Sequence, residues 1–388
     1  MSEVGISIIV PIYHGKEYIP YMIKQVECCK RKIDSDIQVE LLFVNDCPED
    51  EIENYESADV VIRAFNTDTN CGIQSARIKG IGLSLGKYVL LLDQDDKIRE
   101  DYLYSQLENI EKYGADASVC RAIHENRPVY NSQNCFEWVI HLEHMMKDNY
   151  IISPGQVLIR KDSLPIVWKN NLLRNNGADD WLLWLCMLAE KKKFVLNDKC
   201  LYEHTVNGHN ASHNTNKMID SAKEVVQILK SQAIFPSSQI IDLERNLKNS
   251  IRYQIQVLDK FKRMFYFYES WMCRENHTQL LSMQLKKKQY KNIAIYGLSP
   301  MGKQFIRELK KNNEIHVEYV IDREANYYKA DGVDVGITLC TTEEICEQKN
   351  VDAIVVTIVE QEQLVVKELQ KIVNIPVLYM EDILFDRL

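Results

Sequence analysis

The 388-residue sequence lacks an excess of positive charge, since 47 lysines and arginines stand against 56 aspartates and glutamates and give a net charge of −9. Sequence-independent binding to nucleic acid needs a basic surface, so this composition disfavours that class of protein. The sequence also lacks an apolar run of the roughly 20 residues that a membrane-spanning helix requires. Residues 1–5 carry no basic segment ahead of an apolar one, so we expect no cleaved signal peptide.

Cysteine motifs are lacking as well, although cysteine itself is not. The sequence holds 11 cysteines, an odd number, without a C-x-x-C pair and without the close Cys and His spacing of a zinc site. Most of these cysteines lie inside apolar runs. We therefore expect buried free thiols in a reducing cytoplasm and no disulfide framework.

What the sequence does contain is an alternation of short apolar runs and helical patterns. Residues 6–12, 39–44 and 88–92 predict buried strands, and residues 73–85 predict a helix. Strands that alternate with helices indicate an α/β fold with a mainly parallel sheet covered on both faces. We expect this first domain to cover residues 1–215.

The pattern changes twice further along the chain. Residues 216–290 lose the strand signal and show apolar residues spaced by three and four, which predicts a helical linker or a region that forms oligomers. The alternation returns in residues 291–388. About 100 residues suffice for a second, smaller α/β domain, and we expect a Rossmann-like one.

A cluster of carboxylates follows the predicted strand at residues 88–92. Asp93 and Asp95 come directly after it, at the edge of a parallel sheet where ligands bind in open α/β folds. Two such carboxylates could ligate a hard divalent cation that in turn holds a diphosphate. The alternative is a polar turn that happens to be rich in aspartate.

The order of the surrounding motifs carries more information than the cluster alone. One strand ends in Pro11 and Tyr13, the next ends in Asp46, and a glycine-containing segment with Arg77 leads to the carboxylates. Over roughly residues 6–215 this order resembles the family 2 glycosyltransferases, which have the GT-A fold.

The resemblance implies a role for each of these residues. Pro11 and Tyr13 would line a nucleotide pocket, and Asp46 would accept a hydrogen bond from the base, typically uracil. Arg77 would lie near the nucleotide or its diphosphate, and Asp93 would face the ribose. The implied donor is therefore a nucleotide sugar, with UDP as its nucleotide.

The same resemblance implies a cofactor and a base. Asp93 and Asp95 would form the D-x-D motif that holds Mn²⁺ or Mg²⁺. Asp180, preceded by Asp179, resembles the second acid of the family's acidic motif, which removes a proton from the acceptor hydroxyl; Asp179 is a supporting acid or the alternative base. Both aspartates also suit the beginning of a helix, so a helix cap is the competing interpretation.

Histidines follow in the segment that resembles the closing part of the family motif. His204 stands where a basic residue is usual, and His209 lies close by in the sequence. Either could be a third metal ligand or a donor to the diphosphate. Three histidines in a polar loop could equally be solvated and without function.

The C-terminal region carries a weakened dinucleotide fingerprint. Gly297 and Gly302 frame it and Asp322 follows 20 positions later, but Ser299 replaces the second glycine and crowds the pyrophosphate site. A structural, regulatory or oligomeric role is therefore favoured over nucleotide binding or NAD chemistry. The basic and aromatic residues at 260–271 indicate packing between domains or subunits, with contact to a membrane surface as the alternative.

These observations together predict an inverting, metal-dependent glycosyltransferase that adds a sugar to a glycan or lipid-linked saccharide of a bacterial surface polysaccharide. We expect it in the cytoplasm or at the inner face of the membrane, with homo-oligomers as an option and without a nucleic-acid partner. Two other classes remain as alternatives: a GT-A scaffold protein that has lost turnover, and an NAD-dependent oxidoreductase that acts through the C-terminal domain.

Overall fold

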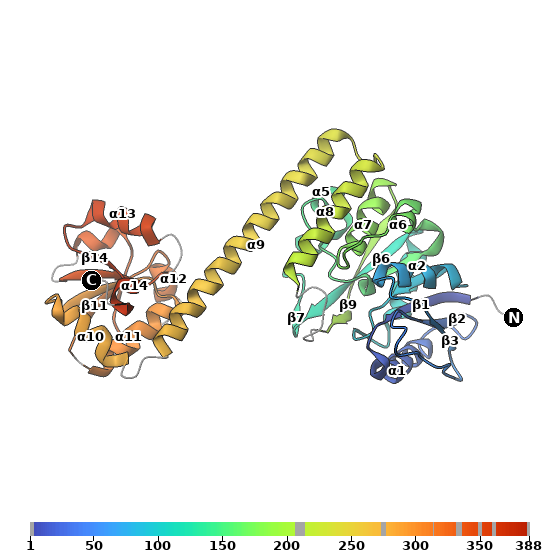
Figure 1. The fold of residues 1–388 in the computed structure, drawn as a ribbon, viewed down its shortest axis with the longest axis horizontal. Coiled ribbons are helices and arrows are strands. Elements are labelled where there is room, and N and C mark those ends of the chain that lie inside the picture. The colour runs from blue at the N-terminus through green and yellow to red at the C-terminus, as the bar shows by residue number, and fades with distance from the viewer. Residues whose placement is uncertain are drawn as a thin grey trace. The chain divides into compact units, whose positions relative to one another are not determined.

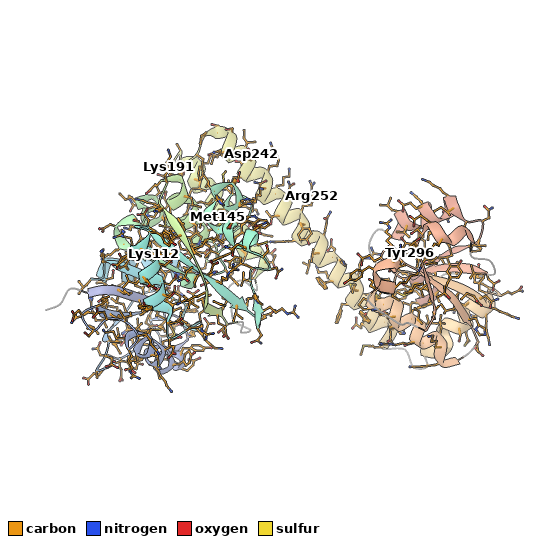
Figure 2. The ribbon with its side chains drawn as sticks, turned by 180° about the vertical axis from the view of Figure 1, so that it is seen from behind. Lys112, Met145, Lys191, Asp242, Arg252 and Tyr296 are labelled. Carbon is orange, nitrogen blue, oxygen red and sulfur yellow. The ribbon has the colours of Figure 1, made fainter. Side chains whose placement is uncertain are left out.

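The computed structural model describes residues 4–205, 214–272, 277–312, 314–330, 336–347, 351–358 and 362–385. The chain forms two compact units, Met1–Arg252 and Tyr253–Leu388 (Figure 1). Helix α9 (Ser237–Met272) contributes its first turns to one unit and the remainder to the other. Figure 2 marks Arg252, the last residue of the first unit, on this helix.

Four parallel strands form one half of the sheet in the first unit. Their order is β3-β2-β1-β4, and they are β1 (Val4–Ile12), β2 (Gln38–Asn45), β3 (Val61–Asn66) and β4 (Tyr88–Leu91). Their apolar runs predicted buried strands, and β1, β2 and β4 are indeed buried. Because the strands are parallel, their carboxyl ends meet at one edge of the sheet.

The other half of the sheet is mixed. Beyond β4 the order continues β8-β6-β9-β5, with β5 (Lys97–Ile98), β6 (Ala117–His124), β8 (Val157–Arg160) and β9 (Phe194–His204). Strand β8 is antiparallel to both β4 and β6, while β6 and β9 are parallel. The expectation of a mainly parallel sheet is therefore wrong for this half, because an apolar run predicts burial on both faces but carries no strand direction.

Helices cover both faces of this sheet. Along β1, Ile9 packs with α2 (Ile73–Leu83) and α7 (Asp179–Ala189) on one face. Ile8, one residue earlier, packs with α1 (Ile19–Lys30) and α3 (Tyr102–Lys112) on the other face, as the period of two requires. The first face extends through α8 (Thr215–Ser231) and the beginning of α9.

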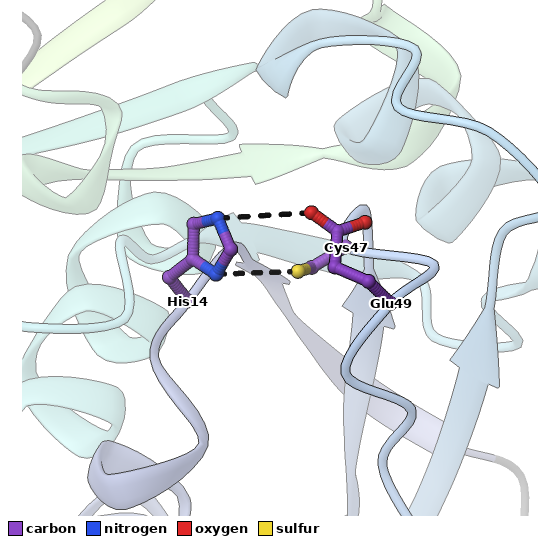
Figure 3. Close-up of side chains that lie close together, drawn as sticks. All are labelled: His14, Cys47 and Glu49. Atoms are coloured by element: carbon purple, nitrogen blue, oxygen red, sulfur yellow. Dashed lines mark hydrogen bonds and ion pairs between the residues drawn. The ribbon is translucent and has the colours of Figure 1, made fainter.

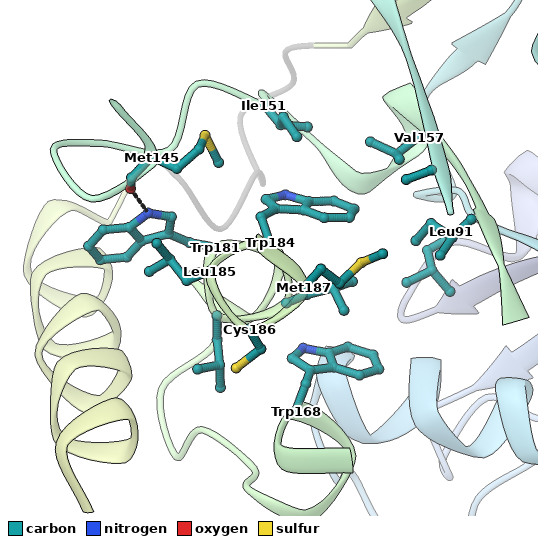
Figure 4. Close-up of a cluster of buried hydrophobic side chains, with 14 of the residues drawn as sticks. Leu91, Met145, Ile151, Val157, Trp168, Trp181, Trp184, Leu185, Cys186 and Met187 are labelled. Atoms are coloured by element: carbon teal, nitrogen blue, oxygen red, sulfur yellow. Dashed lines mark hydrogen bonds between the residues drawn. The ribbon is translucent and has the colours of Figure 1, made fainter. Parts of the chain in front are cut away.

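Helix α7 is apolar on all sides and therefore buried. Trp181, Trp184 and Met187 project from it into the core, and Trp168 packs against it (Figure 4). The Trp181 indole Nε1 donates to the carbonyl oxygen of Met145 at 2.7 Å. The position of this helix matters for function because Asp179 and Asp180 form its first turn.

The second unit contains a smaller sheet of five parallel strands. Its order is β12-β11-β10-β13-β14, from β10 (Asn292–Tyr296), β11 (His316–Ile321), β12 (Thr338–Cys340), β13 (Ala353–Val356) and β14 (Val377–Tyr379). In chain order this is 3-2-1-4-5, the order of doubly wound α/β folds. Its helices are α10 (His277–Lys287), α11 (Pro300–Asn312), α12 (Ala325–Ala330), α13 (Glu362–Ile372) and α14 (Met380–Leu384).

Shorter elements complete the described chain: η1 (Lys16–Tyr18), β7 (Arg127–Pro128), α4 (Gln133–Glu137), η2 (Trp138–Ile140), α5 (Leu142–Met145), η3 (Pro154–Gln156), η4 (Lys161–Ser163), α6 (Ile166–Asn170) and η6 (Glu343–Glu347). Within the described ranges, none of the helices has the length and apolar character needed to pass through a bilayer.

Candidate active site

Three strand ends build the candidate site at the carboxyl edge of the first sheet. Pro11 is buried within β1, and Tyr13 follows that strand with 47% of its surface exposed. The Tyr13 N–H donates to the Gln94 side chain at 2.9 Å, and the Gln94 amide donates back to the Tyr13 carbonyl at 3.1 Å. Gln94 lies between Asp93 and Asp95, so this pair of bonds joins the end of β1 to the carboxylate turn.

Asp46 is buried directly after β2 and fastens a loop. Its Oδ1 accepts hydrogen bonds from the Cys71 N–H at 2.8 Å and the Thr67 hydroxyl at 3.3 Å, and its Oδ2 accepts from the Gly72 N–H at 2.7 Å. Gly72 has a positive φ of 87°, which suits glycine at the beginning of α2. Asp46 therefore positions the segment that leads to Arg77.

Arg77 connects the carboxylate turn to helix α7. Its Nη1 donates to Asp179 at 2.8 Å and its Nη2 donates to Asp93, while only 4% of the side chain is exposed. Burial opposes the charged form, but the carboxylates of Asp179 and Asp93 outweigh it and raise the pKa of Arg77. Arg77 contacts two acids that are 16 and 102 residues away in the sequence; its predicted role near a nucleotide stays a prediction.

Asp180 is a buried carboxylate with an altered pKa. Its Oδ2 accepts from the Asn149 amide at 3.0 Å, and its Oδ1 accepts from the Trp181 N–H at 2.8 Å. Burial, and then the charge of Asp179, raises the pKa of Asp180 to about 7, although Arg77 acts in the opposite direction. A carboxylate with this pKa can accept a proton near neutral pH. Both aspartates also lie in the first turn of α7, so they complement its dipole as well.

The carboxylate turn contains a third acid that sequence reasoning left without a role. Asp96 is 1% exposed, accepts the Thr205 N–H at 2.9 Å, and is bonded to the Tyr202 hydroxyl. Burial, and then Asp93, raises the pKa of Asp96. Asp96 thus anchors the turn to the end of β9, and its position as the third aspartate of the run was the available signal.

The same turn offers ligands for a divalent metal ion. Asp93 and Asp95 are both half-buried, and carboxylate oxygens are what Mg²⁺ and Mn²⁺ prefer. Asp93 already contacts Arg77 and accepts from the Ser153 hydroxyl at 3.3 Å. The donor set of Asp93 and Asp95 therefore fits a hard cation.

His204 lies at the end of β9, directly opposite His124 on β6. Their Nδ1 atoms are 3.0 Å apart, and burial together with His124 lowers the pKa of His204. A neutral imidazole is the form that binds metals. His124 is a partner that the sequence did not indicate. His209, the other predicted ligand, lies outside the described residues.

A further cluster of metal-ligating side chains lies at the same edge and was missed from the sequence. His14, Cys47 and Glu49 bring one ligand atom each to within 4.8 Å of one another (Figure 3). His14 and Cys47 are 33 residues apart, so no local spacing could have indicated the cluster.

The second unit places the weakened fingerprint at the turn between β10 and α11. Gly297 has a positive φ of 101°, and a Cβ on Gly302 would come within 2.1 Å of the Gly297 carbonyl oxygen. Asp322 accepts the Leu298 N–H at 2.7 Å, so this acid bonds to the fingerprint turn itself. The glycines are therefore accounted for by close packing of helix and strand.

Comparison with known proteins finds similarity to glycosyltransferases. The model of the family described as Glycosyl transferase family 2 matches residues 7–168. TuaG of Bacillus subtilis (strain 168), named as a glycosyltransferase of teichuronic acid biosynthesis, is 33% identical over 108 residues, which are 26% of this chain and 40% of TuaG. Glycosyltransferase GlyG of Streptococcus pneumoniae is 26% identical over 124 residues, which are 31% of this chain and 39% of GlyG.

The chain thus spans about two fifths of these two relatives. Among solved structures, S. aureus TarS 1–349 in complex with UDP-GlcNAc has 16% identity and a TM-score of 0.43, over 58% of this chain and 66% of TarS. The matched family model and the mixed α/β sheet agree with the order of motifs along β1, β2 and β4. Residues 7–168 of the first unit therefore match the family 2 glycosyltransferases.

Proposed function

We propose that this protein transfers a sugar from a UDP-sugar to a hydroxyl group of a glycan acceptor, with inversion at the anomeric carbon. The observation that carries the proposal is the buried Asp180, whose pKa of about 7 suits a general base. Through Asp179 and Arg77 this base is joined to the carboxylate turn at Asp93. A base and a donor site are thus held in one network.

The acceptor hydroxyl would attack the anomeric carbon while Asp180 takes its proton. The new bond joins the acceptor oxygen to the anomeric carbon, and the bond from that carbon to the diphosphate oxygen breaks. The electron pair leaves with the nucleoside diphosphate. One in-line displacement of this kind inverts the anomeric configuration.

The donor would lie across the strand ends. Pro11 and Tyr13 would line the nucleoside pocket, with the exposed Tyr13 ring available for stacking on the base. Asp46 retains acceptor capacity for the base beside its bonds to the loop. A bound Mn²⁺ or Mg²⁺ at Asp95 and Asp93 would neutralise charge that develops on the diphosphate.

The wider role follows from the relatives. TuaG is named for teichuronic acid biosynthesis, and ExoO of Rhizobium meliloti, 34% identical over 85 residues, is named for succinoglycan biosynthesis. We propose a lipid-linked or growing surface polysaccharide as the acceptor. The nine cysteines whose side chains the structure describes are free thiols, which agrees with action in a reducing cytoplasm, and we propose the inner face of the membrane as the place of transfer.

The test is release of UDP from a panel of UDP-sugars with Mn²⁺ and a lipid-linked or polysaccharide acceptor present. Wild type should release UDP, and Asp180→Asn, which has nearly the same shape, should lose about 10²–10⁴-fold in kcat. Asp148→Asn is the matched control, because this acid lies one residue from Asn149 but has no bond to Asp180 among the described contacts. Release that is equal in wild type and Asp180→Asn would refute the assigned base, and release by neither would favour a scaffold protein.

A further inference from the structure

We infer that His14, Cys47 and Glu49 form a second metal site, for Zn²⁺, at the carboxyl edge of the first sheet. His14 follows β1, and Cys47 and Glu49 follow β2 (Figure 3). The site is separate from the pair Asp93 and Asp95, because it uses other residues and a different set of donor atoms.

The distances suit a tetrahedral ion after a small adjustment. Cys47 Sγ lies 3.4 Å from His14 Nδ1, and His14 Nε2 lies 3.8 Å from Glu49 Oε1. Ligands around a tetrahedral Zn²⁺ are separated by about 3.3–3.6 Å, as the usual bond lengths require. The Cys–His pair already meets this value. The Glu49 carboxylate approaches the other ring nitrogen, Nε2, so this exposed side chain would need to turn toward Nδ1 to reach the same ion as Cys47; the three ligand atoms already lie within 4.8 Å of one another.

Hydrogen bonds from the Asn45 side chain hold the backbone around Cys47 in place. Asn45 Oδ1 accepts the Cys47 N–H at 3.2 Å, and Asn45 Nδ2 donates to the Cys47 carbonyl at 3.1 Å and to the Asp50 carbonyl at 3.0 Å. Cys47 is fully buried, whereas His14 and Glu49 are exposed. Cys47 therefore offers a buried ligand on an anchored backbone, with two exposed ligands on the solvent side.

The donor types select the metal. A thiol, an imidazole and one carboxylate suit Zn²⁺, whereas Mg²⁺ and Mn²⁺ favour sets of oxygen ligands. Without a metal, burial raises the pKa of the Cys47 thiol. On binding, the Zn–S bond replaces the S–H bond and the proton leaves to solvent. The competing interpretation is a plain S–H···N hydrogen bond between Cys47 and His14.

Three protein ligands leave one position open, as in zinc sites that bind a further ligand. The immediate chain neighbours of these ligands are Tyr13 and Asp46, which line the proposed nucleoside pocket. An ion here would join the ends of β1 and β2 next to Tyr13 and Asp46. Zn²⁺ and UDP should therefore change each other's affinity by the same factor, a consequence that rests on the proposed function.

The experiment uses Co²⁺ as a spectroscopic probe for Zn²⁺, added to the full-length protein with excess Mg²⁺ and no nucleotide. We expect one Co²⁺ per chain with a thiolate-to-cobalt charge-transfer band, which Zn²⁺ displaces. Cys47→Ser should abolish the band. His14→Ala should weaken Zn²⁺ binding by at least roughly tenfold, because loss of a residue that only supports a ligand already costs about that much affinity.

Two control variants separate this site from others. Cys28→Ser removes a half-buried thiol on α1, and Asp95→Asn removes a ligand proposed for the other metal. Both should keep the band. A band that persists in Cys47→Ser, or no band in the wild type, would overturn the inference. Because no nucleotide is present, failure of UDP binding would refute the proposed function and leave this result intact.

Discussion

Replacing Asp180 with asparagine should stabilise the protein at alkaline pH while it removes the base. In the folded protein the pKa of Asp180 is raised to about 7, against about 3.9 for an unfolded aspartate. A group with a raised folded pKa contributes stability that is fully present below about pH 4 and is lost as pH rises through about 7. The buried charge is therefore a destabilising element of the native state above pH 7.

The magnitude follows from the difference between the two pKa values. About three pKa units, at 1.36 kcal/mol each, correspond to roughly 4 kcal/mol at about pH 8. Asparagine has one acceptor oxygen where the carboxylate uses two, so one hydrogen bond worth about 1 kcal/mol is lost. The net expectation for Asp180→Asn is a gain of roughly 3 kcal/mol near pH 8 and no gain near pH 4.

Urea unfolding of both proteins near pH 4 and near pH 8 measures this difference directly. Carboxylates remote from Asp180 titrate alike in wild type and variant, so they cancel in the comparison. If the difference in the free energy of unfolding between variant and wild type is the same at both pH values, the raised pKa of Asp180 is refuted. The same raised pKa predicts that kcat/KM of the wild type falls as pH decreases below about 7.

Two further substitutions test the packing of each unit. Arg77→Gln should lower the free energy of unfolding of the first unit by about 3–5 kcal/mol, because the two carboxylates that Arg77 bridges are left uncompensated. The control Arg31→Gln breaks an exposed ion pair, and in thermal unfolding it should change this free energy by less than about 1 kcal/mol. Equal effects of the two would contradict the assigned network. Gly302→Ala should increase the rate of amide hydrogen exchange in the second unit, because the new Cβ would come within 2.1 Å of the Gly297 carbonyl oxygen. Gly82→Ala, in α2 with open space around it, should instead be stabilising by up to about 1 kcal/mol, and a destabilised Gly82→Ala would contradict this assessment of space.

The sequence predicted the parts of the site that depend on local pattern. Buried strands ending at residues 12, 45 and 91 were visible as apolar runs, and the parallel order of β1, β2 and β4 brings the polar residues after them to one edge. Asp93 and Arg77 were both predicted at this edge. The helix that begins with Asp179 was visible from the apolar residues that follow it.

Contacts between distant segments could not be predicted in this way. Nothing in a single sequence indicates that Arg77 bonds to Asp179, because that pair is formed by the packing of α2 beside α7. The antiparallel direction of β8 and the approach of His14 to Cys47 have the same origin. Each depends on which strands pair with one another, and an apolar run in a single sequence does not indicate which strand will be its neighbour.

The most direct test of the donor site is a calorimetric titration of UDP with and without Mn²⁺, on wild type and on Asp95→Asn, with NAD⁺ as a control ligand. We predict Mn²⁺-dependent UDP binding to wild type that Asp95→Asn loses, and no binding of NAD⁺. Binding of NAD⁺ alone would contradict the transferase proposal and move the functional centre to the second unit.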